Sequence, residues 1–309
     1  MDRFASMRTF VAVAEAASFA AAARALGQSP PAVTRAVAAL EERIGARLFH
    51  RTTRSVRLTD AGTRYLGDAK RILAELEEAE ASAAGAHAAP RGQLGVTASL
   101  MFGRMYVAPL VLEFLARHPA VTARMMLADR LVDMMEEGLE VAVRIAHLED
   151  SSLTAVRVGS VRRIICAAPS YLAERGRPRT PADLAGAKMV TFANGPVPDP
   201  WIFLRDGKRE TFTPAAQLVA NSNEVTIAAA EAGRGFVRAL SYQVASQLRA
   251  GTLEIVLADY EEPPLPVHVI HVAGRRASAR VRAFVDLAVD RLRRDPALNG
   301  AIAAGERGQ

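Results

Sequence analysis

Residues 18–35 read SFAAAARALGQSPPAVTR, and this stretch decides how the first part of the chain folds. Ser18 is a suitable N-cap for a helix predicted over 19–26, and Gly27 ends that helix. A further helix, predicted over 3–17, precedes it, because Phe4, Met7 and Phe10 recur on one helical face. The stretch therefore predicts short helices joined by a tight glycine turn, which is typical of a helix-turn-helix.

The next helix is predicted to begin with Ser29 as its cap and Pro30 at its first position, where the missing N–H costs nothing. Its buried face is predicted from apolar residues spaced by four, three and four: Val33, Val37, Leu40 and Ile44.

In a helix-turn-helix the second helix lies in the major groove and its N-terminal residues face the base edges. Arg35 offers a fork for guanine or phosphate, and Thr34 offers a hydroxyl and a methyl group. A structural helical hairpin with solvated arginines remains an alternative at this point. The candidate DNA-binding residues of this helix are Ser29, Pro30, Pro31, Ala32, Thr34 and Arg35.

Residues 48–59, LFHRTTRSVRLT, predict a short hairpin, or wing, directly after these helices. Arg51 and Arg54 would lie near its tip, where arginines reach phosphates or the minor groove. Residues 1–60 carry 9 Arg against 5 acidic residues, within a chain of 309 residues and net charge +6. A basic unit that combines a helix-turn-helix with a wing favours double-stranded DNA as its partner.

These segments resemble the DNA-binding domain of the LysR-type transcriptional regulators. The resemblance rests on residues 18–26, 40–49, 51–54 and 58–62. Two positions depart from the family pattern: Thr34 stands where Ser is usual, and Pro30 where Gln is frequent. The resemblance implies a homodimer or homotetramer on promoter DNA, with RNA polymerase as a further expected partner.

A long helix is predicted over 63–86, with a heptad seam. The seam consists of Leu66, Ala69, Leu73, Leu76, Glu80 and Ala83. Both the spacing and the resemblance favour a dimerising linker helix over an amphipathic helix that packs only on its own domain.

After Gly92 strand-like and helix-like segments alternate, which predicts a parallel, doubly wound sheet. The predicted segments include strands at 94–98, 121–127, 139–145, 163–168 and 267–272, and helices at 102–117, 131–137, 225–232, 242–248 and 278–294.

The resemblance to the family continues at residues 150–153, 169–172, 232–235, 241–244 and 281–286. It implies two α/β subdomains, similar to a small periplasmic binding protein, with crossovers near Val161 and Pro266. The expected fold class is thus α/β: a winged helix-turn-helix, a linker helix and a two-subdomain C-terminal domain. The expected bounds are 1–61 for DNA binding, 62–90 for the linker and hinge, 91–162 plus 267–309 for subdomain 1, and 163–266 for subdomain 2.

In such folds ligands bind at the carboxyl ends of strands and at helix N-termini. Ser99 and the free N–H groups after it would suit a carboxylate, so we expect a polar or anionic metabolite. Ser99 could instead be only a helix cap. Asn221 could also be a cap, because Glu224 follows it at capping-box spacing, and His147 could be a solvated loop residue. The candidate effector-binding residues are Ser99, Leu100, His147, Phe192, Asn194, Asn221 and Ser222.

No catalytic constellation, metal-binding cluster or cofactor motif is found, so we expect no enzyme, metal or cofactor. Cys166 is the one cysteine and is expected inside a strand. No apolar stretch is long enough for a membrane helix, and a cytoplasmic protein is expected. The sequence therefore predicts an effector-responsive transcriptional regulator. The alternatives are an effector-independent repressor with a vestigial cleft and a cytoplasmic small-molecule binding protein.

Overall fold

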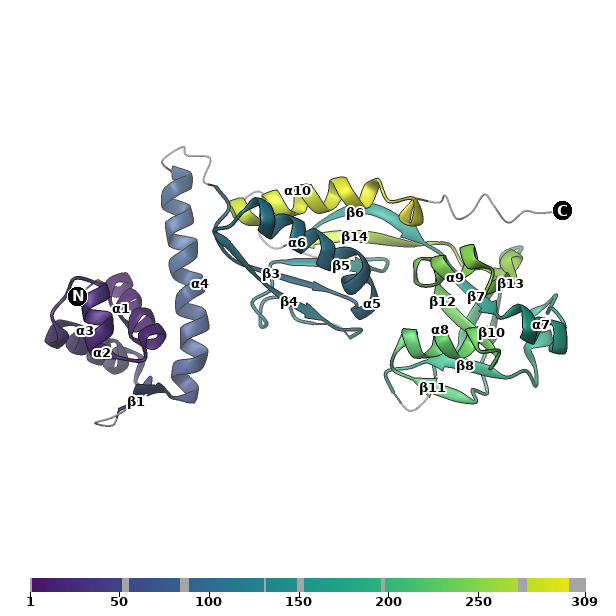
Figure 1. The fold of residues 1–309 in the computed structure, drawn as a ribbon, viewed down its shortest axis with the longest axis horizontal. Coiled ribbons are helices and arrows are strands. Elements are labelled where there is room, and N and C mark those ends of the chain that lie inside the picture. The colour runs from purple at the N-terminus through teal and green to yellow at the C-terminus, as the bar shows by residue number, and fades with distance from the viewer. Residues whose placement is uncertain are drawn as a thin grey trace. The chain divides into compact units, whose positions relative to one another are not determined.

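A computed structural model describes residues 2–51, 56–83, 89–130, 132–148, 153–195, 198–271 and 277–299 (Figure 1). Within these ranges, nothing is described of the side chains of residues 51, 74–75 and 77–83. The chain divides into two compact units, Met1–Ala88 and Ala89–Gln309. In the described part of the chain, no helix is both long and apolar enough to cross a membrane.

The first unit opens with three helices: α1 (Arg3–Ala16), α2 (Phe19–Ala25) and α3 (Pro30–Ile44). The two predicted caps are confirmed, because the Ser18 hydroxyl accepts from the Ala21 N–H at 3.2 Å and the Ser29 hydroxyl from the Ala32 N–H at 3.4 Å. Val33, Val37 and Leu40 are buried as predicted.

Ile44 is the exception on the predicted buried face of α3, because its side chain is 40% exposed. The helix ends there and Gly45 turns the chain away in the left-handed region, at φ 74°. The last residue of the apolar stripe therefore has no core left to pack against.

The predicted wing is present as β1 (Phe49–Arg51) and β2 (Val56–Leu58), paired antiparallel. A buried carboxylate ties it to α3: one oxygen of Glu41 accepts from the Leu48 N–H at 2.8 Å and from the Phe49 N–H at 3.2 Å. The helix-turn-helix and the base of the wing thus share one core.

The long helix α4 spans Asp60–Ala83 and begins three residues earlier than predicted. The Thr59 hydroxyl accepts from the Gly62 N–H at 2.9 Å and thereby caps the helix before Asp60. Gly62 is required here, because a Cβ atom would lie 2.0 Å from the Leu48 carbonyl oxygen. The predicted end at residue 86 lies outside the described residues.

The second unit contains two five-stranded sheets. The first has the order β4-β3-β5-β14-β6. Its strands are β3 (Gly92–Ala98), β4 (Val121–Leu127), β5 (Val141–Ile145), β6 (Thr154–Val161) and β14 (Leu265–His271). Its helices are α5 (Leu100–Phe102), the π-helical η1 (Gly103–Val107), α6 (Ala108–Arg117) and α10 (Ala279–Arg293). Figure 1 shows α6 and α10 side by side on this sheet, where Phe114 and Phe284 meet edge to face.

The second sheet has the order β11-β8-β12-β7-β13. Its strands are β7 (Arg163–Ala167), β8 (Met189–Phe192), β11 (Leu218–Ala220), β12 (Phe236–Leu240) and β13 (Glu254–Val256). Its helices are α7 (Pro169–Arg175), α8 (Asn223–Glu231) and α9 (Ala245–Ala250). Short 3₁₀ turns accompany them: η2 (Pro181–Leu184), η3 (Ser241–Val244) and η4 (Ala258–Tyr260). A further 3₁₀ turn, η6 (Pro296–Leu298), follows α10 of the first sheet. Cys166 is fully buried within β7, as predicted.

Two predictions for this unit were wrong. The sheets are mixed, because β14 runs antiparallel to β5 and β6, and β7 runs antiparallel to β12 and β13. β7 and β14 are the strands at which the chain enters one sheet from the other, and each runs opposite to its neighbours. Residues 134–138 form turns where a helix over 131–137 was predicted: one Asp133 oxygen accepts from the N–H groups of Met135 at 2.8 Å and Glu136 at 3.0 Å.

A hairpin that was not predicted pairs β9 (Trp201–Arg205) with β10 (Lys208–Phe212). Its turn is Asp206-Gly207, with φ of 50° and 74°. An Asp-Gly pair between apolar residues is a strong hairpin signal and would have predicted it. Trp201 and Phe203 of β9 join the core beneath the second sheet.

Candidate functional site

The N-terminal end of α3 presents a group of exposed side chains. Pro30, Pro31, Thr34 and Arg35 are exposed, and Ala32 is half-buried. The Thr34 hydroxyl donates to the Pro30 carbonyl at 3.0 Å. The opposite face of the helix is locked in the core, so this end is both rigid and accessible.

The wing arginines are described only in part. The backbone of Arg51 pairs with Val56 at the end of β1, while its side chain is outside the described residues. Arg54 lies outside them altogether. The wing starts immediately after α3 because Glu41 holds Leu48 and Phe49 in place.

In the second unit, both sheets bring candidate residues to the carboxyl ends of their parallel strands. Ser99, Asp129 and His147 follow β3, β4 and β5. Asn194 and Asn221 follow β8 and β11, which are also parallel neighbours. These are the positions at which open α/β sheets bind ligands.

Asp129 connects the two sets. Its carboxylate accepts from the Leu100 N–H, the first of the helix that follows Ser99, at 2.9 Å. Its backbone carbonyl accepts from the side-chain amide of Asn194 at 3.0 Å. A carboxylate of the chain itself thus occupies the position that the sequence analysis assigned to an anionic effector. Arg104 of η1 and Glu224 of α8 form a second bridge between the subdomains, 2.5 Å long.

An aromatic cluster lies directly behind Ser99. The rings of Phe102 and Tyr106 stack at 4.7 Å, and Tyr242 meets Phe102 edge to face at 5.2 Å. Burial raises the pKa of Tyr242, and a hydrogen bond with the Ser99 side chain opposes part of that rise. Burial also raises the pKa of Tyr106 to about 12. Both phenols are therefore neutral at physiological pH and can only donate or accept hydrogen bonds.

The other predicted effector residues have simpler surroundings. Ser222, not Asn221, caps α8, because its hydroxyl accepts from the Val225 N–H at 3.4 Å. Asn221 is exposed, and Phe192 pairs with the preceding residue, Ala220. His147 is exposed. Burial is the main cause of the lowered pKa of His268, and His147 contributes to it.

The structure adds Asp129 and Tyr242 to the predicted residues. Asp129 follows a strand that the sequence analysis placed correctly, so its position at the ligand edge was a usable signal. Tyr242 follows the carboxyl end of β12, a parallel neighbour of β8, so the same signal was usable there, although its contacts with Phe102 and Tyr106 could not be predicted. Among the described residues, no group of His, Cys, Asp or Glu is placed to hold a metal ion.

Two family models match the chain. The model of the bacterial regulatory helix-turn-helix protein, lysR family, matches residues 4–63, and that of the LysR substrate binding domain matches residues 87–293. The chain belongs to the LysR family of transcriptional regulators. It is a DNA-binding regulator with an effector-binding domain, as the sequence resemblance indicated.

Known members of the LysR family resemble the chain over nearly its whole length. An HTH-type transcriptional repressor of Pseudomonas aeruginosa (strain UCBPP-PA14) is 33% identical, over 96% of this chain and 94% of that protein. An HTH-type transcriptional regulator of Xanthomonas campestris pv. campestris (strain 8004) is 36% identical, over 93% and 84%. The structure of CrgA, a LysR-type regulator from Neisseria meningitidis, is 29% identical, with a TM-score of 0.59 over 94% and 99%.

Proposed function

We propose that this LysR-type regulator reads its operator through the N-terminal end of α3. The observation that carries this proposal is the exposure of Pro30, Pro31, Thr34 and Arg35 on a helix whose other face is locked in the core. Thr34 and Arg35 supply the groups that contact base edges, and Ser29 and Ala32 lie beside them against the DNA backbone. Arg51 and Arg54 of the wing contact phosphates or the minor groove.

Binding of the full-length protein to its own upstream DNA, compared with shuffled DNA of equal length, tests this proposal. Fluorescence anisotropy at several salt concentrations separates the two kinds of contact, because phosphate contacts set the salt dependence. A preference for the upstream DNA that survives at raised salt supports the proposal. Equal affinity for both duplexes would contradict it.

We further propose that α4 joins two copies of the chain. Leu66, Ala69 and Leu73 pack against the core of the helix-turn-helix unit, whereas the half-buried Leu76 is not part of that cluster. Among the described seam residues, Leu76 is thus the one open to a partner helix. The linker and hinge then comprise residues 62–90. Subdomain 1 comprises residues 91–162 and 267–309, and subdomain 2 comprises residues 163–266. Assembly to a homotetramer would use these subdomains.

For the effector we propose a polar or anionic metabolite that binds between the subdomains and exchanges with Asp129. Asp129 holds the Leu100 N–H and, through Asn194, the opposite subdomain. An effector carboxylate that takes over the Leu100 N–H would displace the Asp129 side chain and, if the backbone there moves with it, loosen the Asn194 contact on the Asp129 carbonyl and open the cleft. Ser99, Asn221, Ser222, Phe192 and His147 lie on the same strand ends and would contact the rest of the molecule.

A second candidate function is supported by the same bridges. An effector-independent regulator would keep the cleft closed through Asp129–Asn194 and Arg104–Glu224. A thermal-shift screen of small carboxylates, amines and neutral metabolites separates the two functions. Stabilisation by one compound, together with a change in operator affinity, supports the effector-dependent function. In either case we propose a non-catalytic protein that acts on DNA in the cytoplasm and adjusts transcription by RNA polymerase.

A further inference from the structure

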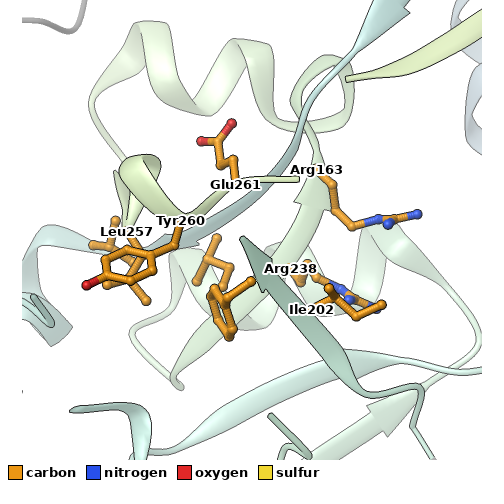
Figure 2. Close-up of a pocket in the computed structure, with 9 residues that line it drawn as sticks. Arg163, Ile202, Arg238, Leu257, Tyr260 and Glu261 are labelled. Atoms are coloured by element: carbon orange, nitrogen blue, oxygen red, sulfur yellow. The ribbon is translucent and has the colours of Figure 1, made fainter. Parts of the chain in front are cut away.

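The two sheets of the second unit are connected by the crossovers, residues 161–163 and 261–265, which leave the first sheet side by side. Val161, the last residue of β6, pairs with Leu265, the first residue of β14. Figure 2 shows Glu261, just after η4, and Arg163, at the start of β7, on neighbouring segments. A movement of one subdomain against the other must therefore bend both crossovers together.

The second crossover is stiff because of its own sequence. Pro263 and Pro264 have fixed φ angles, and Glu262, which precedes a proline, is restricted to extended conformations. A hinge needs residues whose backbone angles can change, so this segment resists bending.

Two ion pairs, which we call the crossover clamp, fasten the crossovers to each other. Arg162 donates to both carboxylate oxygens of Glu261, at 2.6 and 2.7 Å, and Arg163 donates to Glu262 at 2.6 Å. The four side chains are between 13% and 32% exposed. Partly buried pairs, and bidentate ones above all, hold their geometry better than exposed pairs do.

Backbone and apolar contacts continue the crossover clamp into the middle of the domain. Ser241, which follows β12, donates its N–H to the Arg162 carbonyl at 2.8 Å, and its hydroxyl accepts from the Arg162 N–H at 3.1 Å. The next residue, Tyr242, is fully buried in the core of the first sheet, although it follows a strand of the second. It meets Phe102 there edge to face at 5.2 Å.

The bridges Asp129–Asn194 and Arg104–Glu224 lie on the other side of both sheets. In the order β4-β3-β5-β14-β6, Asp129 follows the outermost strand at one end, and the crossovers leave from the two strands at the other end. In the order β11-β8-β12-β7-β13, β8 and β11 precede Asn194 and Glu224, and β7 lies beyond β12. The two groups of contacts are thus separated by the width of the sheets.

We propose that the crossover clamp and Tyr242 form a stiff pivot, so that the two subdomains separate at the Asp129–Asn194 side and not at the crossovers. Opening then requires the loss of two side-chain bridges, while the ion pairs, the Ser241 hydrogen bonds and the Tyr242 contacts persist. This division applies to an effector-dependent and to an effector-independent regulator alike, so its test needs no ligand.

The distance distribution between two nitroxide labels measures the stiffness of the pivot. The labels are attached to Asp286→Cys on α10 and Glu174→Cys on α7, both exposed positions, whereas Cys166 is fully buried. Labelled full-length protein is diluted with unlabelled protein, so that distances within one chain dominate. Glu261→Ala should widen the distribution at least about twofold, because the crossovers then bend independently.

A matched ion pair inside the second subdomain provides the control. Glu254 pairs with Arg177, and Glu254→Ala should leave the width unchanged. Glu261→Gln keeps the size of the side chain and should widen the distribution less than Glu261→Ala, which keeps the test decisive if the alanine variant is unstable. An unchanged width in the Glu261 variants, or equal widening in Glu254→Ala, would overturn the proposal.

Asn194→Ala tests the opposite side of the domain by hydrogen–deuterium exchange. Loss of the hydrogen bond to the Asp129 carbonyl should speed exchange in peptides that contain Leu100. Peptides that contain Arg162 and Ser241, whose N–H groups bond across the pivot, should exchange at the parental rate. Faster exchange of these peptides in Asn194→Ala would mean that the crossovers yield together with the bridges, and would overturn the proposal.

Discussion

The carboxylate of Asp129 accepts a hydrogen bond from the backbone N–H of Leu100 at 2.9 Å, at the start of the helix that follows β3. The backbone carbonyl of the same residue accepts from Asn194 in the other subdomain. Asp129 thus acts as an internal anion at the site proposed for an effector anion. The two would compete, both for the N–H group and by charge repulsion.

Asp129→Asn should therefore strengthen the binding of an anionic effector by about five- to tenfold, because it removes the competing negative charge and leaves only a neutral acceptor beside the Leu100 N–H. Isothermal titration calorimetry with the compound found by thermal shift measures it. Glu136→Gln, an exposed acid of the following turn, is the matched control and should change nothing. Weaker binding in Asp129→Asn would show instead that Asp129 contacts a cationic group of the effector.

Arg35→Ala should weaken operator binding by about 1–3 kcal/mol if Arg35 reads a base, because a bidentate contact to guanine would be lost. Anisotropy on the operator and on operators mutated one base pair at a time measures the loss and its location. Arg8→Ala, an exposed arginine on α1, controls for the change in net charge. An equal loss on operator and shuffled DNA would assign Arg35 to the phosphates.

Leu76→Asp should dissociate the dimer, because it places an unpaired charge in the part of the seam that does not pack on the helix-turn-helix core. Sedimentation velocity of the full chain gives the oligomeric state, and a monomer should also bind its operator more weakly. Arg64→Asp, at an exposed position of the same helix, is the control. A dimer unchanged in Leu76→Asp would place the interface elsewhere.

Glu41→Ala should destabilise the winged helix-turn-helix by about 2–3 kcal/mol, because the buried N–H groups of Leu48 and Phe49 lose their acceptor. Chemical denaturation of the full chain should show an earlier transition for this unit. The exposed neighbour Glu42 provides the comparison, and Glu42→Ala should be close to neutral. Identical transitions in both variants would mean that water replaces the Glu41 carboxylate without cost.

His268 should make the stability of the effector domain sensitive to acid. Burial, followed by the nearby Arg157, lowers its pKa below 6.5, so the folded state favours the neutral ring. The unfolded chain takes up the proton first, and stability should fall as the pH drops through about 6.5. His268→Gln should flatten that dependence in pH-dependent melting curves, whereas the exposed His50→Gln should not. Parallel curves for the wild type and His268→Gln would contradict this prediction.

The amino-acid sequence by itself determined the first unit. Its signals are local. The hydroxyls of Ser18 and Ser29 each cap a helix by accepting from the N–H group three residues further on, and the buried Val33, Val37 and Leu40 follow the helical period. Elements whose stability comes from neighbouring residues can be predicted without knowing what they pack on. The same holds for β4, whose predicted bounds match the structure, and for the buried Cys166.

Only the tertiary structure decided the direction of β14, the role of Asp129 and the partner of Arg162. Each depends on contacts between residues far apart in the chain: Asp129 with Asn194, and Arg162 with Glu261. A strand carries no mark of whether its neighbour is parallel, since the same alternating pattern serves both pairings. Likewise, a carboxylate or a guanidinium shows its charge in the sequence but not its partner, because the partner is chosen by how the sheets bring distant segments together.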